Sequence, residues 1–188
     1  IAAGQLSLNE GGQISAGQTL QLSADALSNQ GLLSGQNVLV QTAMLDNQSG
    51  VIEAANSLQV TAGYVNNTAG TLVSQGELSL DLQGQQDGIA LNNDGGKVIA
   101  TGALALITPY AVNNTAGQLL SEQQLHIQAG ALNNSSGEIL AGSGLTVNLD
   151  TVLDNSGGVL YTRQGDMTLT AQSLLNDADG LILQHGTG

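Results

Sequence analysis

The sequence predicts an all-β protein folded as a right-handed parallel β-helix, a solenoid of about nine coils with a repeat of ~20 residues. Three observations support this fold class. A glycine preceded by amide residues recurs along the whole chain, aliphatic and variable residues alternate after each such glycine, and no segment shows a sustained helical period. Because a repeat this short cannot bury its own apolar face, successive repeats are expected to stack on one another.

The repeating glycines, which we call the anchor glycines, set the period. By subtraction of their positions they stand 19, 19, 20, 26, 21, 20, 21 and 22 residues apart. They are Gly12, Gly31, Gly50, Gly70, Gly96, Gly117, Gly137, Gly158 and Gly180. An aliphatic residue follows each of them two positions later, at Ile14, Leu33, Ile52, Leu72, Val98, Leu119, Ile139, Leu160 and Ile182. This alternation is typical of a strand that buries one side.

A second strand follows in each repeat. Four residues after most anchor glycines the side chain is small, and an apolar-x-apolar pattern comes next, as in Leu58/Val60 and Leu125/Ile127. Period-2 alternation in both segments predicts strands with a tapered interior between them.

The amide pair before each anchor glycine is predicted to mark a corner of the coil. Asparagine tolerates left-handed backbone geometry, and stacked amides can hydrogen-bond from one coil to the next as a ladder. The predicted ladder contains Asn29, Asn47, Asn67, Asn93, Asn114, Asn134 and Asn155, with Asp177 in the last coil. A structural role is expected for this column, in preference to catalysis or ligand binding.

Residues 1–188 are expected to form one β-helical segment with an insertion loop at 81–90. Such loops in solenoids are either tolerated excursions or places for binding. Ile1–Ala3 are predicted to belong to a first strand, with Leu6 and Leu8 in the second strand. Since both ends then fall inside a coil, we expect the chain to be a segment cut from a longer rod.

Composition excludes several classes of partner. The chain has 2 Lys and Arg against 15 Asp and Glu, a formal net charge of −13, so nucleic acid and anionic membrane surfaces are not expected to bind. Cysteine is absent, which excludes disulfides and thiolate metal sites. No apolar run is long enough to insert into a membrane, and no signal peptide is visible.

No catalytic, cofactor or metal site is predicted. A carbohydrate-active β-helix enzyme is the alternative from another class, and it needs clustered carboxylates or a base beside a cation. The cations Lys97 and Arg163 are about three coils apart, and His126 is expected to point outward from a strand. Asp150 and Asp154 are expected to be solvated turn carboxylates. A glycan-binding rod would favour stacked aromatic residues, but the tyrosines, Tyr64, Tyr110 and Tyr161, occupy non-equivalent positions.

One outward column is apolar, which a plain shaft does not need. Three residues after each anchor glycine the early coils carry polar Ser15, Ser34 and Glu53. The later coils form a candidate partner stripe of Val73, Ile99, Leu120, Leu140, Tyr161 and Leu183. Contiguous exposed apolar surface favours a partner or a cover. Three interpretations stay open: a binding surface, a strip covered by the insertion or by flanking chain, and a corner where these residues turn inward.

The register of the coils resembles the repeats of filamentous haemagglutinin-like exoproteins. The resemblance rests on "LNNDGGKVIA" from Leu91, "VNNTAGQLLS" from Val112 and similar segments, each followed by an L-x-[LV]-x-[AT] strand, over almost the entire chain. This family comprises large surface proteins of Gram-negative two-partner secretion systems, including adhesins and contact-dependent growth inhibition effectors. The resemblance implies a right-handed β-helix that crosses the outer membrane unfolded through a partner pore.

The expected function is therefore that of an extended shaft or adhesive segment, secreted to or displayed at the surface of a Gram-negative bacterium. It would mediate contact with another cell, either as an adhesin or by delivering a growth-inhibition toxin. A receptor on a target bacterium or host cell is the expected partner if this segment itself recognises the target.

Overall fold

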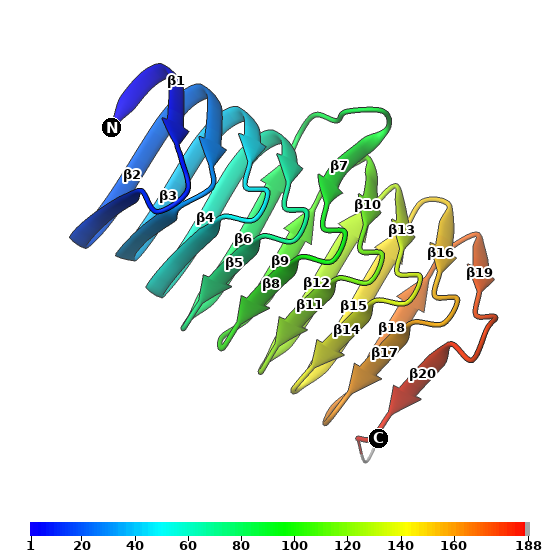
Figure 1. The fold of residues 1–188 in the computed structure, drawn as a ribbon. Coiled ribbons are helices and arrows are strands. Elements are labelled where there is room, and N and C mark those ends of the chain that lie inside the picture. Colours follow the sequence, from blue (N-terminus) through cyan, green and yellow to red (C-terminus); the bar gives the residue numbers. More distant parts are fainter. Residues whose placement is uncertain (187–188) are drawn as a thin grey trace.

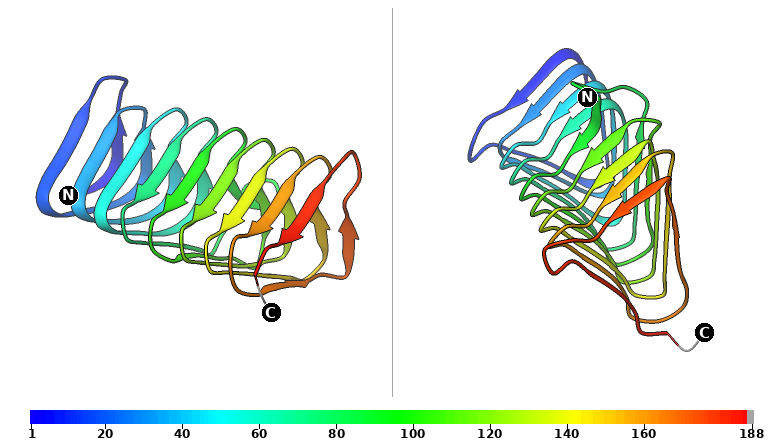
Figure 2. Two further views of the ribbon diagram at one scale, coloured as in Figure 1. Left: turned by 90° about the horizontal axis from the view of Figure 1, so that it is seen from below. Right: turned by 90° about the vertical axis from the view of Figure 1, so that its right-hand side faces the viewer.

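The computed structural model describes residues 1–186, and these form an all-β solenoid of parallel strands stacked along one axis (Figure 1). The predicted fold class, with about nine coils of about 20 residues, is confirmed in this arrangement. At ~4.8 Å per coil the stack is a rod roughly 40 Å long. The strands β1 and β20, the first and the last of the described residues, lie at opposite ends of the rod (Figures 1 and 2).

Each coil has three sides, which we call the first, second and third faces in chain order. Three long strands run across all three faces, and β1 runs across the last two. These strands are β1 (Ala2–Leu8), β2 (Gln13–Asn29), β3 (Leu32–Asp46) and β4 (Val51–Asn66). From the fourth anchor glycine onward each face has a separate short strand.

The short strands of each face pair in parallel with those of the coils before and after. The first face has β5 (Thr71–Ser74), β8 (Lys97–Ala100), β11 (Gln118–Ser121), β14 (Glu138–Ala141), β17 (Val159–Thr162) and β20 (Leu181–Gln184). The second has β6 (Glu77–Leu82), β9 (Leu104–Ile107), β12 (Gln124–Ala129), β15 (Gly144–Leu149) and β18 (Met167–Thr170). The third has β7 (Ile89–Asn92), β10 (Ala111–Asn113), β13 (Ala131–Asn133), β16 (Val152–Asp154) and β19 (Ser173–Leu175).

The first coil does not have the predicted register. Ala2 pairs with Ser23 and Leu6 pairs with Leu27, so these residues belong to the second and third faces and not to the first and second. Leu8 consequently stacks on Asn29, at the place where later coils carry the ladder asparagine. The physical reason is that Leu6 continues the apolar column of Leu27, which is fully buried, whereas the predicted register would leave that column unfilled.

The interior is a column of aliphatic side chains. The predicted inward residues after the anchor glycines are fully buried from Leu33 to Leu160, while Ile14 and Ile182 in the end coils are half-buried. Four residues after the anchor the space narrows, and the side chains there are small and buried, as at Ala54, Ser74 and Ala100. The rod therefore builds its core without aromatic residues, because every coil repeats the same tightly filled cross-section.

The turn at the asparagine corner uses left-handed backbone geometry in most coils, but not at the asparagine itself. The positive φ falls on the residue just before the anchor glycine, as at Ser49 (59°), Ala69 (52°), Ala116 (50°) and Ser136 (56°). The expectation that asparagine itself takes this conformation is therefore wrong. A non-glycine residue in this conformation costs about 1 kcal/mol because Cβ crowds the carbonyl oxygen.

This geometry makes a small stabilising change available. Ala116→Gly is expected to raise the free energy of unfolding by roughly 0.5–1 kcal/mol, since glycine adopts positive φ without that crowding. Ala105→Gly on β9, where φ is not positive, is the matched control and should lower it by a similar amount. Urea unfolding followed by circular dichroism checks both, and a loss of stability in Ala116→Gly would contradict this explanation of the turn.

Candidate functional site

The asparagine column runs along the corner between the third and first faces. Each of the seven predicted ladder asparagines has no exposed surface. The Nδ2 group of each donates to Oδ1 of the asparagine in the next coil at 2.7 Å, in an unbroken series from Asn29 to Asn176. From Asn47 onward Nδ2 also donates to the carbonyl oxygen of its own anchor glycine, and to that of the first-face strand in the next coil. The side-chain amides are therefore hydrogen-bonded to neighbouring coils and stabilise the stack.

In the last coil one predicted member of this column is wrong. Asn176, and not Asp177, accepts the amide of Asn155 at 2.7 Å. The turn that follows has one extra residue, so that both Ala178 and Asp179 take positive φ before Gly180. A carboxylate can only accept, whereas the Asn176 amide accepts from Asn155 and donates to the Gly180 carbonyl oxygen at 2.8 Å. The prediction placed the ladder residue three positions before the anchor glycine, as in most earlier coils. In the last coil the turn is one residue longer, so the ladder residue stands four positions before Gly180.

The stripe residues lie in one column on the outside of the first face. Strand pairing connects Val73 with Ile99, Ile99 with Leu120, Leu120 with Leu140, Leu140 with Tyr161, and Tyr161 with Leu183. All but the last are half-buried, and Leu183 is 39% exposed. They alternate with fully buried residues such as Leu119 and Ile139, so their side chains face away from the interior. Polar residues run beside the stripe, and Gln118 Nε2 donates to Glu138 Oε2 there at 2.8 Å.

The insertion lies on the other side of the rod. β6 ends at Leu82 and β7 begins at Ile89, so the loop consists of residues 83–88 and connects the second face to the third. Gln86 and Ile89 exchange backbone hydrogen bonds around Asp87 and Gly88, both of which have positive φ. Burial raises the pKa of Tyr64 on the third face, and the Asp46 and Asp87 carboxylates raise it further. The insertion therefore borders the third face, and the interpretation that it covers the stripe is wrong.

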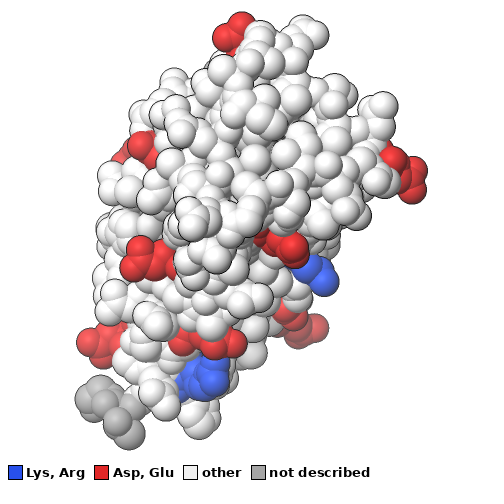
Figure 3. All heavy atoms as spheres, turned by 90° about the vertical axis from the view of Figure 1, so that its left-hand side faces the viewer, with Lys and Arg blue, Asp and Glu red and all other residues white. Residues whose placement is uncertain are grey.

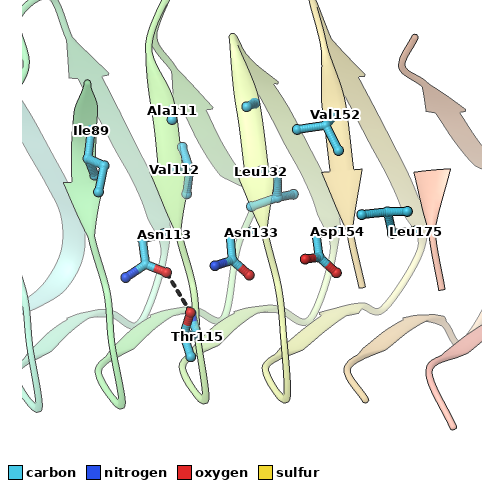
Figure 4. A pocket seen from close by; sticks show the side chains of 11 residues that line it. Ile89, Ala111, Val112, Asn113, Thr115, Leu132, Asn133, Val152, Asp154 and Leu175 are labelled. Carbon is cyan, nitrogen blue, oxygen red and sulfur yellow. Dashed lines mark hydrogen bonds between the residues drawn. The ribbon is translucent and has the colours of Figure 1, made fainter. Parts of the chain in front are cut away.

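A shallow groove of about 480 Å³ follows the third face across several coils (Figure 4). One column of outward residues forms its length, with small Ala111 and Ala131 between the bulkier Ile89 and Val152. A second column of polar residues, Asn113, Asn133 and Asp154, forms one edge. The sequence analysis missed this groove. A column-by-column alignment could have shown the two alanines, but not the register shift beside Ile89 that places it in their column.

Within residues 1–186, the histidine and acidic side chains form no cluster suited to metal binding. His126 points outward from β12 and shares a hollow on the second face with Ser143 and Asp166, but within residues 1–186 no hydrogen bond joins these three side chains. Over the same part of the chain no three His, Asp or Glu residues are placed to hold a metal ion. The described residues also contain no helix able to span a membrane. Acidic groups are spread over the side of the rod that Figure 3 shows, with two basic groups among them.

Comparison with known protein families gives a match over the whole chain. The haemagglutinin repeat family matches residues 1–45, 32–108 and 111–188, so that successive matches follow the coils described above. The chain belongs to the haemagglutinin repeat family. No curated protein and no solved structure matches it.

The haemagglutinin repeats of this chain account for its shape. Each ~20-residue repeat of the sequence forms one coil, each family match spans several coils, and the resemblance noted in the sequence is confirmed by the family match. Haemagglutinin repeats form structural, adhesin-type segments, and the coils form an adhesin-like extended shaft. The stripe on the first face and the groove on the third face are two apolar surfaces of the described coils.

Proposed function

We propose that this chain is a shaft segment of a secreted exoprotein at the surface of a Gram-negative bacterium, and that it mediates contact with another cell. The observation that carries the proposal is the uninterrupted stack of haemagglutinin-repeat coils from β1 to β20. A stack in which each coil rises ~4.8 Å turns a long chain into a stiff spacer that holds a binding or toxic part away from the producing cell. Export unfolded through an outer-membrane pore fits a chain with no cysteine.

The charge of the chain supports a role in a crowded cell surface. With 15 acidic residues against 2 basic ones, neighbouring rods repel one another and stay soluble. We propose that the chain is exported as part of a two-partner secretion system and serves in adhesion or in toxin delivery. A soluble, acidic rod is compatible with either role. The stripe is the part of the shaft that we propose to contact a receptor on the target cell.

The test is direct binding of the fluorescently labelled chain to a panel of Gram-negative bacteria, including strains with truncated lipopolysaccharide, and to epithelial cells. Saturable binding to one class of cell identifies the target class. A double variant, Leu120→Ser with Leu140→Ser, should weaken that binding about tenfold or more, because two half-buried apolar side chains leave the contact.

The matched control removes two outward apolar residues from another face. Leu39→Ser with Ile107→Ser alters the second face, where Ile107 is 40% exposed, and should leave binding unchanged. Equal binding by wild type and the stripe variant, both folded by circular dichroism, would refute the stripe as a receptor surface. If the folded wild type shows no saturable binding to any cell, the segment acts as a plain shaft.

A further inference from the structure

The groove on the third face is a place where the rod departs from its own regularity. The outward column that reads Met44 and Tyr64 in early coils narrows to Ala111 and Ala131 in the middle of the rod. Between the larger Ile89 and Val152, these two methyl groups leave a trough whose floor is apolar (Figure 4). Such a hollow, apolar with a few polar groups at its edge, is typical of a binding site.

The polar edge of the trough has unused hydrogen-bonding capacity. In the preceding coils the outer column pairs with itself: Asn66 donates to Asp46 at 2.9 Å, and Asn113 donates to Asn92 at 2.8 Å. Beyond Asn113 this pairing stops. Asn133 and Asp154 each use one oxygen to accept from the serine two residues on. Among residues 1–186 no hydrogen-bond partner is found for Asn133 Nδ2, and the partners of the Asp154 carboxylate are Ser156 and, as a smaller contribution, the Ser135 hydroxyl.

The charge at this edge is also not neutralised. Hydrogen bonds from the Ser156 hydroxyl and backbone N–H hold the pKa of Asp154 below its ordinary value, so the carboxylate is ionised at neutral pH. No ion pair is found within the described part of the chain. Lys97 lies on the first face and Arg163 follows β17 of that face, so neither belongs to the lining of the groove. The groove is therefore an apolar trough with an uncompensated negative charge at its edge.

We propose that this groove binds an extended, basic peptide segment of a partner protein, with aliphatic side chains over Ala111 and Ala131 and a lysine or arginine cation at Asp154. A lysine suits such a place, because its methylene stem can lie on apolar surface while its ammonium group reaches the carboxylate. Asn133 Nδ2 donates to a carbonyl oxygen of the bound segment. A segment with this composition is also drawn to a rod whose net charge is −13. This inference concerns a different face from the stripe and does not rest on the function proposed above.

The probe is an acetylated, fluorescein-labelled octapeptide of alternating valine and lysine, and its matched control has glutamine in place of every lysine. Binding is followed by fluorescence anisotropy, and the contact surface is mapped from amide chemical shifts of the ¹⁵N-labelled chain. We expect the lysine peptide to bind in a saturable manner and to perturb the amides of Ile89, Ala111, Ala131 and Asp154. The glutamine peptide should bind at least about fivefold more weakly.

Two variants test the two halves of the site. Asp154→Asn keeps the hydrogen bonds to Ser156, as Asn133 does with Ser135, and should weaken binding of the lysine peptide about fivefold. Ala111→Val with Ala131→Val fills the trough with the side chain that the neighbouring coil carries at Val152, and should weaken binding about tenfold without unfolding the rod. Glu77→Gln on the second face removes the same charge elsewhere and should change binding less than twofold.

Three results would overturn the proposal. Equal loss in Asp154→Asn and Glu77→Gln, with shifts spread over all faces, would show diffuse attraction to an acidic rod. Unchanged binding by the filled trough would place the contact elsewhere. Equal binding of the glutamine peptide would show an apolar surface without a preference for cations.

Discussion

Asn114→Leu is expected to lower the free energy of unfolding by about 3 kcal/mol or more. Leucine has the branched outline of asparagine but bulkier terminal groups, so the change removes all hydrogen bonding of the side chain and adds some crowding. The wild-type amide accepts from Asn93 and donates to Asn134, each at 2.7 Å, in a place with no exposed surface. The variant leaves Asn134 Oδ1 buried without the donor from the coil before it. Asn93 keeps its two carbonyl partners, Gly96 and Gln118, which limits the loss on that side.

The control for this change is the neighbouring amide. Asn113 is half-buried on the outside of the third face, donates to Asn92 at 2.8 Å and accepts from the backbone N–H and the hydroxyl of Thr115, and water can replace these bonds there. Asn113→Leu should therefore cost about 1 kcal/mol or less. Both variants are compared by urea unfolding followed by circular dichroism. If both variants lower the free energy of unfolding by a similar amount, burial in the ladder does not increase the contribution of the amide to stability.

Gly117→Ala is expected to lower the free energy of unfolding by about 3 kcal/mol, as much as Asn114→Leu or more. A Cβ at Gly117 would clash with the Asn93 carbonyl oxygen of the preceding coil, and it would also lie 2.6 Å from Asn114 Oδ1 and 2.8 Å from Asn93 Nδ2. Real Cβ atoms essentially never come within 3.0 Å of such neighbours. The coils would have to separate locally, which lengthens ladder and backbone hydrogen bonds together. The anchor glycine is therefore required by the close approach of two coils and not by its own φ.

Gly95→Ala is the matched control, because Gly95 has a positive φ but no close contact with the neighbouring coil. Gly95 has φ +59° with nothing within 4 Å of a built Cβ, and the equivalent places in neighbouring coils hold Ala69 and Ala116. Alanine is known to fit there, so the cost should be about 1 kcal/mol. Thermal and urea unfolding of the two variants side by side check the difference. If Gly117→Ala is as well tolerated as Gly95→Ala, the close approach does not constrain the corner.

Most of the fold follows from sequence because each signal is repeated in every coil. The aliphatic residues two after each anchor glycine predict one buried column, and the structure buries that column from Leu33 to Leu160. A wrong register in one coil would break the column above and below it, so neighbouring repeats correct one another. The first coil has a neighbour on one side only, and there the predicted register of Leu6 was wrong.

The features that the sequence did not predict depend on single residues at turns and on the shape of the surface. The choice of Asn176 over Asp177 depends on a turn with one additional residue, which the repeat spacing disguised. In four coils the left-handed position falls on Ala or Ser, at Ser49, Ala69, Ala116 and Ser136, and these residue types carry no signal for that geometry. The groove arises where a register shift beside Ile89 meets two alanines, and a concavity of this kind is invisible to period and composition.

The direction of the hydrogen bonds decides how such a rod responds to tension. The bonds between coils, backbone and ladder alike, lie along the axis, and β1 and β20 lie at opposite ends of the stack. A pull on β1 and β20 along the axis therefore puts the same tension on every interface between coils, and the weakest interface opens first while the others stay closed. Each released coil of about 20 residues can lengthen by roughly 60 Å, since an extended chain spans ~3.3–3.6 Å per residue against a rise of ~4.8 Å in the stack. A pulled shaft of this design yields in steps and can absorb work before contact is lost.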